Sequence, residues 1–465
     1  MSGTRKMTGL AMVAGLCLIL GSGLKAGAQA TQAPAAGQDA AGVSKAPKYT
    51  QAEYNAEQAC AAEKVPATVI KCLDDFVAKY PNSDLLSYVY QLYYQAYNAQ
   101  KNYPKMIESA DKLAALGDKV DALTRFNAYF AHVNTYYTMV SDPATGPAAS
   151  KDVPQAKAAM AAAAAALKAI DDLKKPDNVT DDAWAKQKTQ SLITLNGIAA
   201  LAASNAKDCS SAVTSYKAVL ALNPDDFTSN YRLGLAYMCL TPPQQTDAFW
   251  SIARAVTAKS ATQAQAAKVK DYLRKLIMNY QGGTVCDSLT DAELNELLQL
   301  AGSAVDRPGS YSVPSAADLA TAQKDMTIAS VITDLKTGGD KGKLTWFASC
   351  GLEFPEVPGK VIEIVPGATA ADPIVLKIAF VTSDAEFDAA TTPNMDVKVV
   401  GQPEAARVEK DGAIHFTGTL VAYDPDPAFF LHWDKAKVKE EDIPKEKGAP
   451  KKPVHKPAPK KPSGN

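Results

Sequence analysis

The stretch FTSNYRLGLAYMCL, residues 227–240, reads as an apolar helix with a glycine near its centre. Glycine costs a helix about 1 kcal/mol relative to alanine, so the position must gain something from lacking a side chain. Gly234 follows Leu233 and precedes Tyr237 by three residues. We therefore expect a second helix to cross closely at Gly234, where any side chain would hold the two helices apart.

The flanking segments have helical spacing as well. Small and aromatic residues recur at intervals of four and three before Pro224, and again after the break at 242–243. This arrangement resembles the tetratricopeptide repeat, a 34-residue helix–turn–helix unit with Leu-Gly and Tyr in its first helix and small residues in its second. The resemblance rests on Ala212, Tyr216, Pro224, Leu233, Gly234, Tyr237, Ala248 and Ala255.

A looser match covers residues 69–113, where Pro81 takes the closing-proline position but Gln91 replaces the glycine. Residues 120–190 fit only as generic helical hairpins and include the alanine-rich run at 156–175. Prolines and turn residues interrupt the helical pattern every 12–20 residues. The sequence therefore predicts a mainly α protein with a tetratricopeptide-like α-solenoid over residues 50–305.

After the solenoid, residues 306–350 are predicted to form helices and a linker that cap its end. Between 351 and 438 the pattern changes to short β-branched or alternating runs, at 359–367, 373–382, 395–402, 406–410, 412–424 and 428–438. Such strands suit a small all-β barrel. The last two runs resemble the end of an oligonucleotide/oligosaccharide-binding (OB) barrel, and an immunoglobulin-like sandwich is the alternative.

Both ends of the chain differ from its body. Arg5 and Lys6 precede an apolar run at 10–24, and Ala28 and Ala30 have A-x-A spacing, which is typical of a signal peptide cleaved near Ala30. We therefore expect a protein that is exported to the periplasm or secreted, without a transmembrane span. Residues 31–49 are predicted to be a disordered leader.

A lysine- and proline-rich disordered tail is predicted for residues 439–465. Residues 444–465 contain seven lysines and one glutamate, so the tail is basic while the body of the chain is acidic. Export makes nucleic acid an unexpected partner. An anionic envelope surface is a more suitable contact for the tail, although a solvated linker explains its composition equally well.

Cysteine usage agrees with export, because six cysteines remain after cleavage and six allow fifteen disulfide pairings. Cys60 and Cys72 lie symmetrically about Pro66. Cys209 is expected at the start of one helix and Cys239 near the end of the next, and the two helices run antiparallel. The resulting pairs are Cys60–Cys72, Cys209–Cys239 and, by elimination, Cys286–Cys350. No spacing typical of a metal site is present.

Catalytic motifs are missing from the chain, and we expect neither an enzyme nor a cofactor. His132 falls in an aromatic helical stripe, which favours a buried structural role. His432 lies beside Trp433, and the two could form a small surface site. Gly338 and Gly339 lack the strand-to-helix setting of a phosphate loop and are interpreted as a turn.

The resemblance to tetratricopeptide repeats implies a partner-binding groove lined by the first helices of successive repeats. The positions that would face it are Thr228, Tyr231, Leu235 and Met238 in the best repeat, and Leu85, Tyr88, Leu92 and Gln95 in the earlier one. Tyr88 and Tyr93 are also predicted to lie off the core face of the tyrosine-rich run at 88–103. Such a lining suits a peptide segment, and the alternative is that these side chains pack within the solenoid.

Two functions follow from these patterns. The first is a noncatalytic exported scaffold that binds a protein or peptide partner through the helical region. The alternative is an envelope ligand-binding protein in which the β domain holds a glycan or another oligomer and the solenoid serves as a scaffold.

Overall fold

The structure, a computed structural model, describes residues 49–445 apart from 284, 310, 368, 370 and 371. The predicted signal peptide, all but the last residue of the predicted leader and most of the basic tail lie outside the described residues. The chain divides into two compact units, one ending at Ala266 and the other starting at Ala267. We call them the helical unit and the C-terminal unit.

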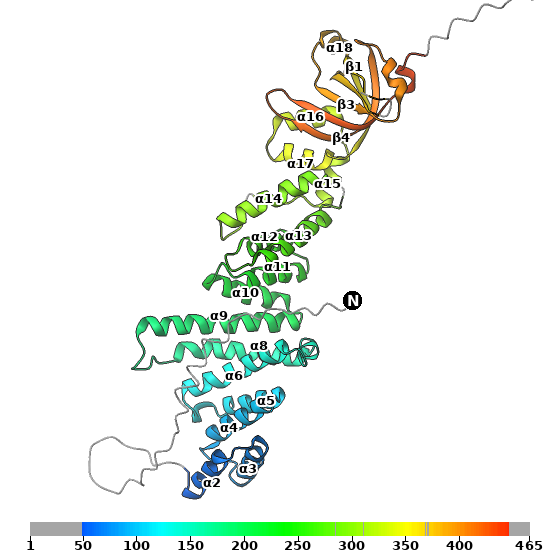
Figure 1. Ribbon diagram of the computed structural model, residues 1–465. Helices are drawn as coiled ribbons and strands as arrows, with labels where there is room; N and C mark the ends of the chain where they lie inside the picture. Colours follow the sequence, from blue (N-terminus) through cyan, green and yellow to red (C-terminus); the bar gives the residue numbers. More distant parts are fainter. Residues whose placement is uncertain (1–48, 284, 310, 368, 370–371, 446–465) are drawn as a thin grey trace, which may run out of the picture. The chain divides into compact units, whose positions relative to one another are not determined.

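The helical unit is a series of helices in which each packs on a neighbour along the chain (Figure 1). Acidic or hydroxyl side chains begin several of them, and Asp226 caps the helix after Pro224 by accepting from the Ser229 backbone N–H at 2.7 Å. The helices are α2 (Gln51–Ala62), α3 (Pro66–Lys79), α4 (Leu86–Ala99), α5 (Tyr103–Ala114), α6 (Ala122–Ser141), α7 (Gly146–Ala149), α8 (Val153–Ala169), α9 (Asp181–Asn205), α10 (Cys209–Leu222), α11 (Phe227–Cys239) and α12 (Gln245–Thr257).

The close crossing expected at Gly234 is present between α11 and α12. A Cβ atom at this position would overlap the Ile252 side chain and lie 2.9 Å from the carbonyl oxygen of Ala248. Leu233 and Ala236 on either side of the glycine are buried. The helix propensity lost at Gly234 is therefore offset by direct backbone-to-side-chain contact along this helix pair.

Alanine has a similar role in α8. Its buried face is formed by Ala156, Ala159, Ala163 and Ala166, none of which is more than 1% exposed. These residues belong to one core with aromatic side chains of α6, such as Phe126 and Tyr136. Small side chains let α6, α8 and α9 approach closely, and aromatic rings fill the space that remains.

Disulfides link three pairs of cysteines among the described residues, and they are the pairs predicted from the sequence. Cys60 is joined to Cys72, Cys209 to Cys239 and Cys286 to Cys350, with Cα–Cα distances of 5.4, 5.7 and 5.8 Å. The first two lie within the helical unit and the third within the C-terminal unit. Disulfides of this kind are typical of proteins in an oxidising compartment.

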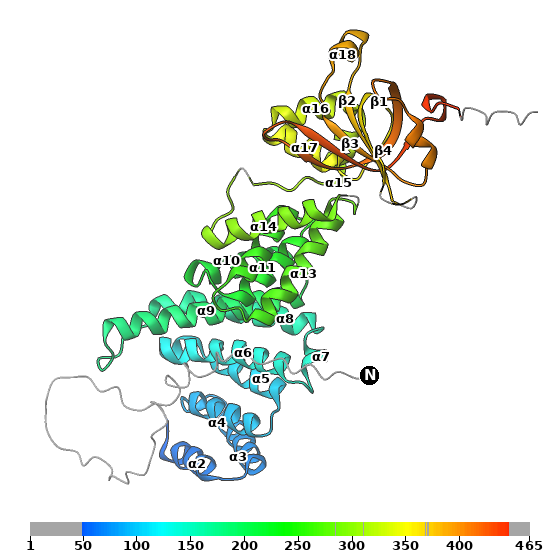
Figure 2. The same cartoon turned by 45° about the horizontal axis from the view of Figure 1, so that its top comes forward.

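In the C-terminal unit, helices precede and flank a β-barrel. The helices are α13 (Gln263–Tyr280), whose first turn belongs to the helical unit, α14 (Asp287–Ser303), α15 (Ala316–Gln323), α16 (Ile328–Thr337), α17 (Gly339–Ser349) and α18 (Asp384–Ala389). Figure 2 shows α16 and α17 beside the strands. Val331 and Leu335 of α16 are buried in the barrel's core. The apolar face of α16 therefore packs on the barrel, a contact that the prediction of capping helices over residues 306–350 did not include.

Five strands form a closed barrel in the order β1-β2-β3-β5-β4. They are β1 (Glu353–Val365), β2 (Ile374–Phe380), β3 (Met395–Val399), β4 (Ala413–Asp424) and β5 (Phe430–Val438). All neighbours pair antiparallel except β3 and β5, which run parallel. Trp433 is fully buried at the centre, and its ring meets those of Phe354 and Phe416 edge-on. The predicted barrel is confirmed, and the sandwich alternative is wrong.

Three details of the barrel differ from the predictions or refine them. Residues 406–410 are not a strand, because Pro403–Arg407 forms a 3-10 helix that turns Ala405 and Val408 into the core. Gly418 in β4 lies at a register shift between Thr417 and Thr419, where β4 pairs with β5. The barrel also continues into the predicted tail, since Ile443 is buried in the same core.

Candidate functional site

Helix α11 has one buried side and one half-buried side. Leu233 and Ala236 face neighbouring helices. The four side chains predicted to face a partner, Thr228, Tyr231, Leu235 and Met238, are all half-buried. Their spacing of three, four and three residues places them on one side of the helix, and the Tyr231 ring stacks on that of Phe227 with centroids 6.4 Å apart.

Helix α4 places three of its four predicted residues on its outer side. Tyr88 is 58% exposed, Gln95 is exposed and Leu92 is half-buried. Leu85 is buried just before the helix begins, so its prediction as a partner-facing residue is wrong.

The prediction that Tyr93 is accessible is also wrong. This side chain is buried between α4 and α3, and its hydroxyl donates to Asp74 at 2.5 Å. Burial, reinforced by the Asp74 carboxylate, raises the pKa of the Tyr93 hydroxyl far above its ordinary value. Tyr90, Tyr94 and Tyr97 of the same helix are half-buried. Helix α4 therefore contacts its neighbours over more of its circumference than a single stripe.

The two predicted faces do not meet in one site. Helices α4 and α11 belong to the same unit but are separated along the stack by α5 to α10 (Figure 1). We call them the α4 face (Tyr88, Leu92 and Gln95) and the α11 face (Thr228, Tyr231, Leu235 and Met238). A ligand that touches both must be long, and this requirement favours a polypeptide segment over a small molecule.

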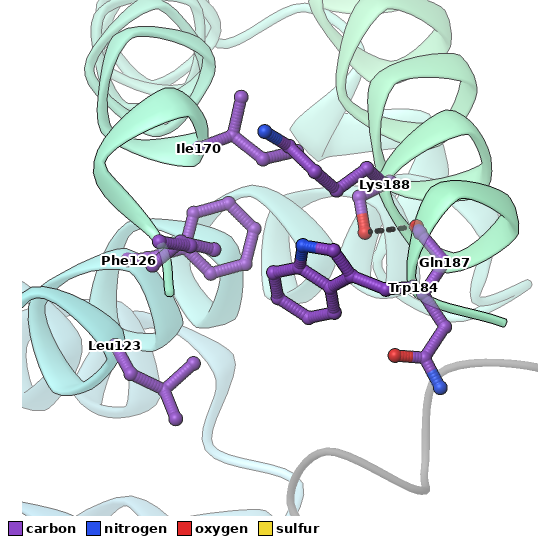
Figure 3. A pocket seen from close by; sticks show the side chains of 8 residues that line it. Leu123, Phe126, Ile170, Trp184, Gln187 and Lys188 are labelled. Carbon is purple, nitrogen blue, oxygen red and sulfur yellow. Dashed lines mark hydrogen bonds between the residues drawn. The ribbon is translucent and has the colours of Figure 1, made fainter. Parts of the chain in front are cut away.

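A pocket in the helical unit lies between α6 and α9 (Figure 3). Trp184 points toward Phe126 and Ile170 there, and the Ser191 hydroxyl donates to the Gln187 carbonyl oxygen at 2.9 Å. Its volume of about 10 Å³ holds no more than one water molecule. The pocket is therefore a small packing defect and not a ligand site.

A much larger space lies in the C-terminal unit. It has a volume of about 300 Å³, which is at the lower end of the range for small-molecule sites. We call it the α14–α17 cleft. Its walls include Glu293 and Glu296 of α14, Gly338 and Gly339 before α17, Lys343 and Trp346 of α17, and Tyr423 of β4.

Glu293 is the principal charged group of the cleft, and only 1% of the residue is exposed. Its Oε1 atom accepts from the Tyr311 hydroxyl at 3.0 Å. Its Oε2 atom has no hydrogen-bond partner, and the Lys343 ammonium lies 3.5 Å away, within ion-pair distance only. Burial raises the pKa of Glu293, and the positive charge of Lys343 opposes that rise.

The start of α17 forms another part of the wall. Gly338 and Gly339 have φ angles of 69° and 63°, so they form the turn that the sequence predicted, here between two helices. A Cβ at either position would meet nothing within 4 Å. The N-terminus of α17 receives no hydrogen bond from a capping side chain, and the first N–H groups of a helix have no partner inside it.

Aromatic rings close one side of the cleft. Trp346 and Tyr423 are both half-buried and meet edge-on with centroids 4.9 Å apart. The Tyr423 ring also contacts Phe429, and the Lys336 ammonium lies over the Phe429 ring at 5.2 Å. These contacts fix the rings of β4 and α17 against the barrel.

His432 and Trp433 do not form the small surface site that their adjacency suggested. Trp433 points into the barrel, whereas His432 points outward, as alternate residues of a strand do. The Nδ1 atom of His432 lies 2.8 Å from Asp396 and its Nε2 atom 2.9 Å from Asp424. Both ring nitrogens are therefore occupied by carboxylates that connect β3, β4 and β5.

The other histidine prediction agrees with the structure, because His132 is buried and its Nδ1 atom lies 2.6 Å from Asp111. Among the described residues, no three His, Cys, Asp or Glu side chains are grouped so as to hold a metal ion. Within the same residues, no helix has the length and apolar character needed to cross a membrane. Comparison of the chain with protein-family models, curated proteins and solved structures gave no match.

Sequence reasoning missed the α14–α17 cleft, although one signal of it is visible. Glu293 lies midway between Leu289 and Leu297, four residues from each, on the side of α14 that packs inward. A carboxylate in register with leucines marks a buried charge, and buried charges need a partner. The partners Tyr311 and Lys343 come from separate segments, and nothing in the sequence predicts that they meet Glu293.

Proposed function

We propose that this chain is an exported, noncatalytic interaction protein. Its helical unit, a tetratricopeptide-like stack, binds an extended or helical segment of a protein partner. The observation that carries the proposal is the half-buried, largely apolar α11 face, which lies on the side of the helix away from the buried Leu233. The exposed Tyr88 of the α4 face supplies a second contact of the same chemistry.

The chemistry of the two faces supports a polypeptide ligand. Tyrosine, leucine and methionine side chains bury large apolar areas, and tyrosine and methionine are enriched in protein interfaces. Anchors at intervals of three, four and three residues suit an apolar ridge of a helix or an extended segment. Neither face contains the lysine or arginine that a terminal carboxylate would require, so the partner segment is expected to be internal.

Export is part of the same proposal. The three disulfides support an oxidising compartment, and the basic, apolar and A-x-A segments at residues 5–30 support cleavage of a signal peptide. The strand order of the barrel supports its resemblance to OB barrels.

Alanine substitution of each face tests the proposal. Tyr88→Ala, and Tyr231→Ala combined with Met238→Ala, should each weaken co-purification of a partner from the envelope fraction at least tenfold, since buried aromatic anchors contribute most to binding. Leu222→Ala serves as the control, because Leu222 is 41% exposed on α10 and lies outside both faces. The proposal would be contradicted if the two face variants and Leu222→Ala lost the partner equally, or if neither face variant weakened co-purification of the partner.

A further inference from the structure

On the outer face of the barrel, one histidine joins three strands. His432 of β5 pairs with Asp396 of β3 on one side and with Ala422 of β4 on the other. Its Nδ1 atom lies 2.8 Å from Asp396 Oδ1, and its Nε2 atom lies 2.9 Å from Asp424 Oδ2. We call Asp396, His432 and Asp424 the His432 bridge.

These two distances decide how many protons the ring must carry. An ionised carboxylate only accepts hydrogen bonds, and a neutral imidazole has one N–H and one lone pair. A neutral His432 would therefore donate to one carboxylate and turn its lone pair toward the other. The imidazolium has an N–H at both nitrogens and donates to both carboxylates, so the bridge is complete only when the ring is charged.

The charges around the ring agree with an imidazolium. Lys377 of β2 pairs with Asp396 in the sheet, and its ammonium lies 3.6 Å from that carboxylate. Two cations then face two anions, whereas a neutral ring would leave one carboxylate without a countercharge. The next charged residues on the surrounding elements are Lys398 of β3, Asp434 of β5, Asp426 between β4 and β5, and Lys336 of α16.

The two carboxylates of the bridge differ in their access to water. The Asp396 side chain is 16% exposed and also pairs with Lys377, whereas the Asp424 side chain is 60% exposed. Water can replace a hydrogen bond lost by an exposed carboxylate, and a buried one has no such substitute. A ring with a single N–H therefore satisfies Asp396 and leaves Asp424 to the solvent.

Asp424 is the last residue of β4, where the chain turns toward β5. Residues 425–428 of this turn are exposed, so the bond to His432 is a contact that ties its start to the sheet. Tyr423 beside it meets Trp346 of α17 edge-on and also contacts the Phe429 ring at the end of the turn. A change at Asp424 can therefore reach the ring contact between the barrel and α17.

We propose that the His432 bridge is a pH-sensitive switch. The imidazolium ties the end of β4 to β3 through β5. Loss of the Nε2 proton to the solvent releases Asp424 and loosens the β4–β5 turn and the Tyr423–Trp346 contact. The bridge is complete at acidic pH and is lost as pH rises through the range in which histidines titrate, about pH 5 to 8. This switch does not depend on partner binding by the α4 and α11 faces, so either proposal can fail without the other.

Hydrogen exchange of the full oxidised chain at about pH 5.5 and about pH 8 tests the switch, with each rate compared with the intrinsic rate at the same pH. Protection of residues 422–432 should fall about three- to fivefold at the higher pH, because one partly exposed charged pair is lost. Over the same interval, the ¹⁵N signals of the His432 ring should change from two protonated nitrogens to one. Protection of the paired strands β1 and β2 should stay the same and serves as the internal reference.

Three substitutions locate the effect. In Asp424→Asn the amide can accept from an N–H or donate to a bare nitrogen, so the turn should stay protected at both pH values. His432→Gln has no titrating ring and should also show no pH dependence. His415→Gln is the matched control, because His415 is another outward-facing histidine of the barrel, with Nδ1 3.1 Å from Asp442. Its turn should loosen with pH as in the unsubstituted chain.

Several results would overturn the proposal. One is equal protection of residues 422–432 at the two pH values in the unsubstituted chain. Another is a pH dependence that survives in Asp424→Asn and His432→Gln. A third is a His432 ring that carries a single proton at the lower pH. If His432→Gln does not fold, Asp424→Asn decides, because the Asp424 side chain is 60% exposed.

Discussion

The two units of this chain differ in where they keep polar groups. Within the described residues of the helical unit, the buried side-chain atoms without a hydrogen bond are His132 Nε2 and Tyr216 Oη. In the C-terminal unit they include both amide atoms of Gln281, Thr290 Oγ1 and Glu293 Oε2, on or near α14. The helical unit is close-packed by alanine and Gly234, and it offers its surroundings only the outer surface of its helices. The C-terminal unit has an open cleft with polar groups in its walls.

The close packing of the helical unit and the open cleft of the C-terminal unit suit different kinds of ligand. A stack without internal space recognises long partners that lie along its surface, whereas a cleft recognises something small that satisfies its polar walls. This difference also separates the energetic roles of the two units. Substitutions in the helical unit should change its stability through helix packing. Substitutions near the cleft should change the stability of the C-terminal unit through charge and solvation.

The largest effect should come from Trp433→Ala. Removing this fully buried ring costs about 3–5 kcal/mol, and the loss should be confined to the C-terminal unit. Hydrogen exchange followed by mass spectrometry in mild urea would report each unit separately. Loss of protection in the helical unit as well would break the division between the units. Trp433→Phe is the control and should cost less, because it keeps an aromatic ring and removes an unsatisfied indole N–H.

Removing disulfides compares the units directly. The Cys286–Cys350 bridge spans 64 residues and Cys60–Cys72 spans 12. Chain-entropy arguments assign about 4 kcal/mol to the longer loop and about 3 kcal/mol to the shorter one. Paired serine substitutions, followed by urea unfolding, should therefore destabilise the C-terminal unit more than the helical unit. The reverse order would contradict this expectation.

Gly234→Ala tests the close packing of the helical unit. The new methyl group would overlap Ile252 and crowd the Ala248 carbonyl, so we expect a loss of about 1–3 kcal/mol in unfolding free energy. Gly197 in α9 is the matched control, because a Cβ there would meet only Val219 Cγ2 at 4.0 Å. Gly197→Ala should stabilise the unit by up to about 1 kcal/mol. Equal effects at the two glycines would show that α11 and α12 do not require close contact.

The smallest change should be a pH dependence at Glu293. Burial raises its folded pKa above the ordinary value of 4.5, so its contribution to stability is fully present below about pH 4.5 and is lost as pH rises through the raised pKa. Glu293→Gln should remove this decline and raise the thermal midpoint of the C-terminal unit at neutral pH. Glu296→Gln should leave the decline in place. If the stability of Glu293→Gln fell more steeply with rising pH than that of the unsubstituted protein, the pKa of Glu293 would not be raised by folding.

Much of the architecture was predictable because it depends on local signals. The Leu233–Gly234 pair, Pro224 and the spacings of Cys60–Cys72 and Cys209–Cys239 each indicate pairing of helices that lie close in the sequence, with the paired cysteines 12 and 30 residues apart. In the barrel, alternation predicted most strands, but the run at 406–410 was misread because Val408 packs inward from a 3-10 turn. Tyr93 was misjudged because α4 has helices on two sides and no single core face.

The α14–α17 cleft was beyond such reasoning. It requires residues near 293, 343 and 423 to meet, and no local spacing carries that information. Only the carboxylate of Glu293 among leucines hinted at it. The α4 and α11 faces, in contrast, were predicted from the resemblance to tetratricopeptide repeats, which implies the positions that would face a groove.

The central claim is that a protein segment lies on the α4 and α11 faces of the helical unit. Placing the photo-cross-linking residue p-benzoylphenylalanine at Tyr88, Tyr231 or Leu235 of the full chain in its own cells tests it most directly, with Lys217 on α10 and Val421 on β4 as exposed control positions. Irradiation should give the same protein adduct from all three face positions and none from the controls. Adducts from Val421 alone, or from every position alike, would contradict the claim.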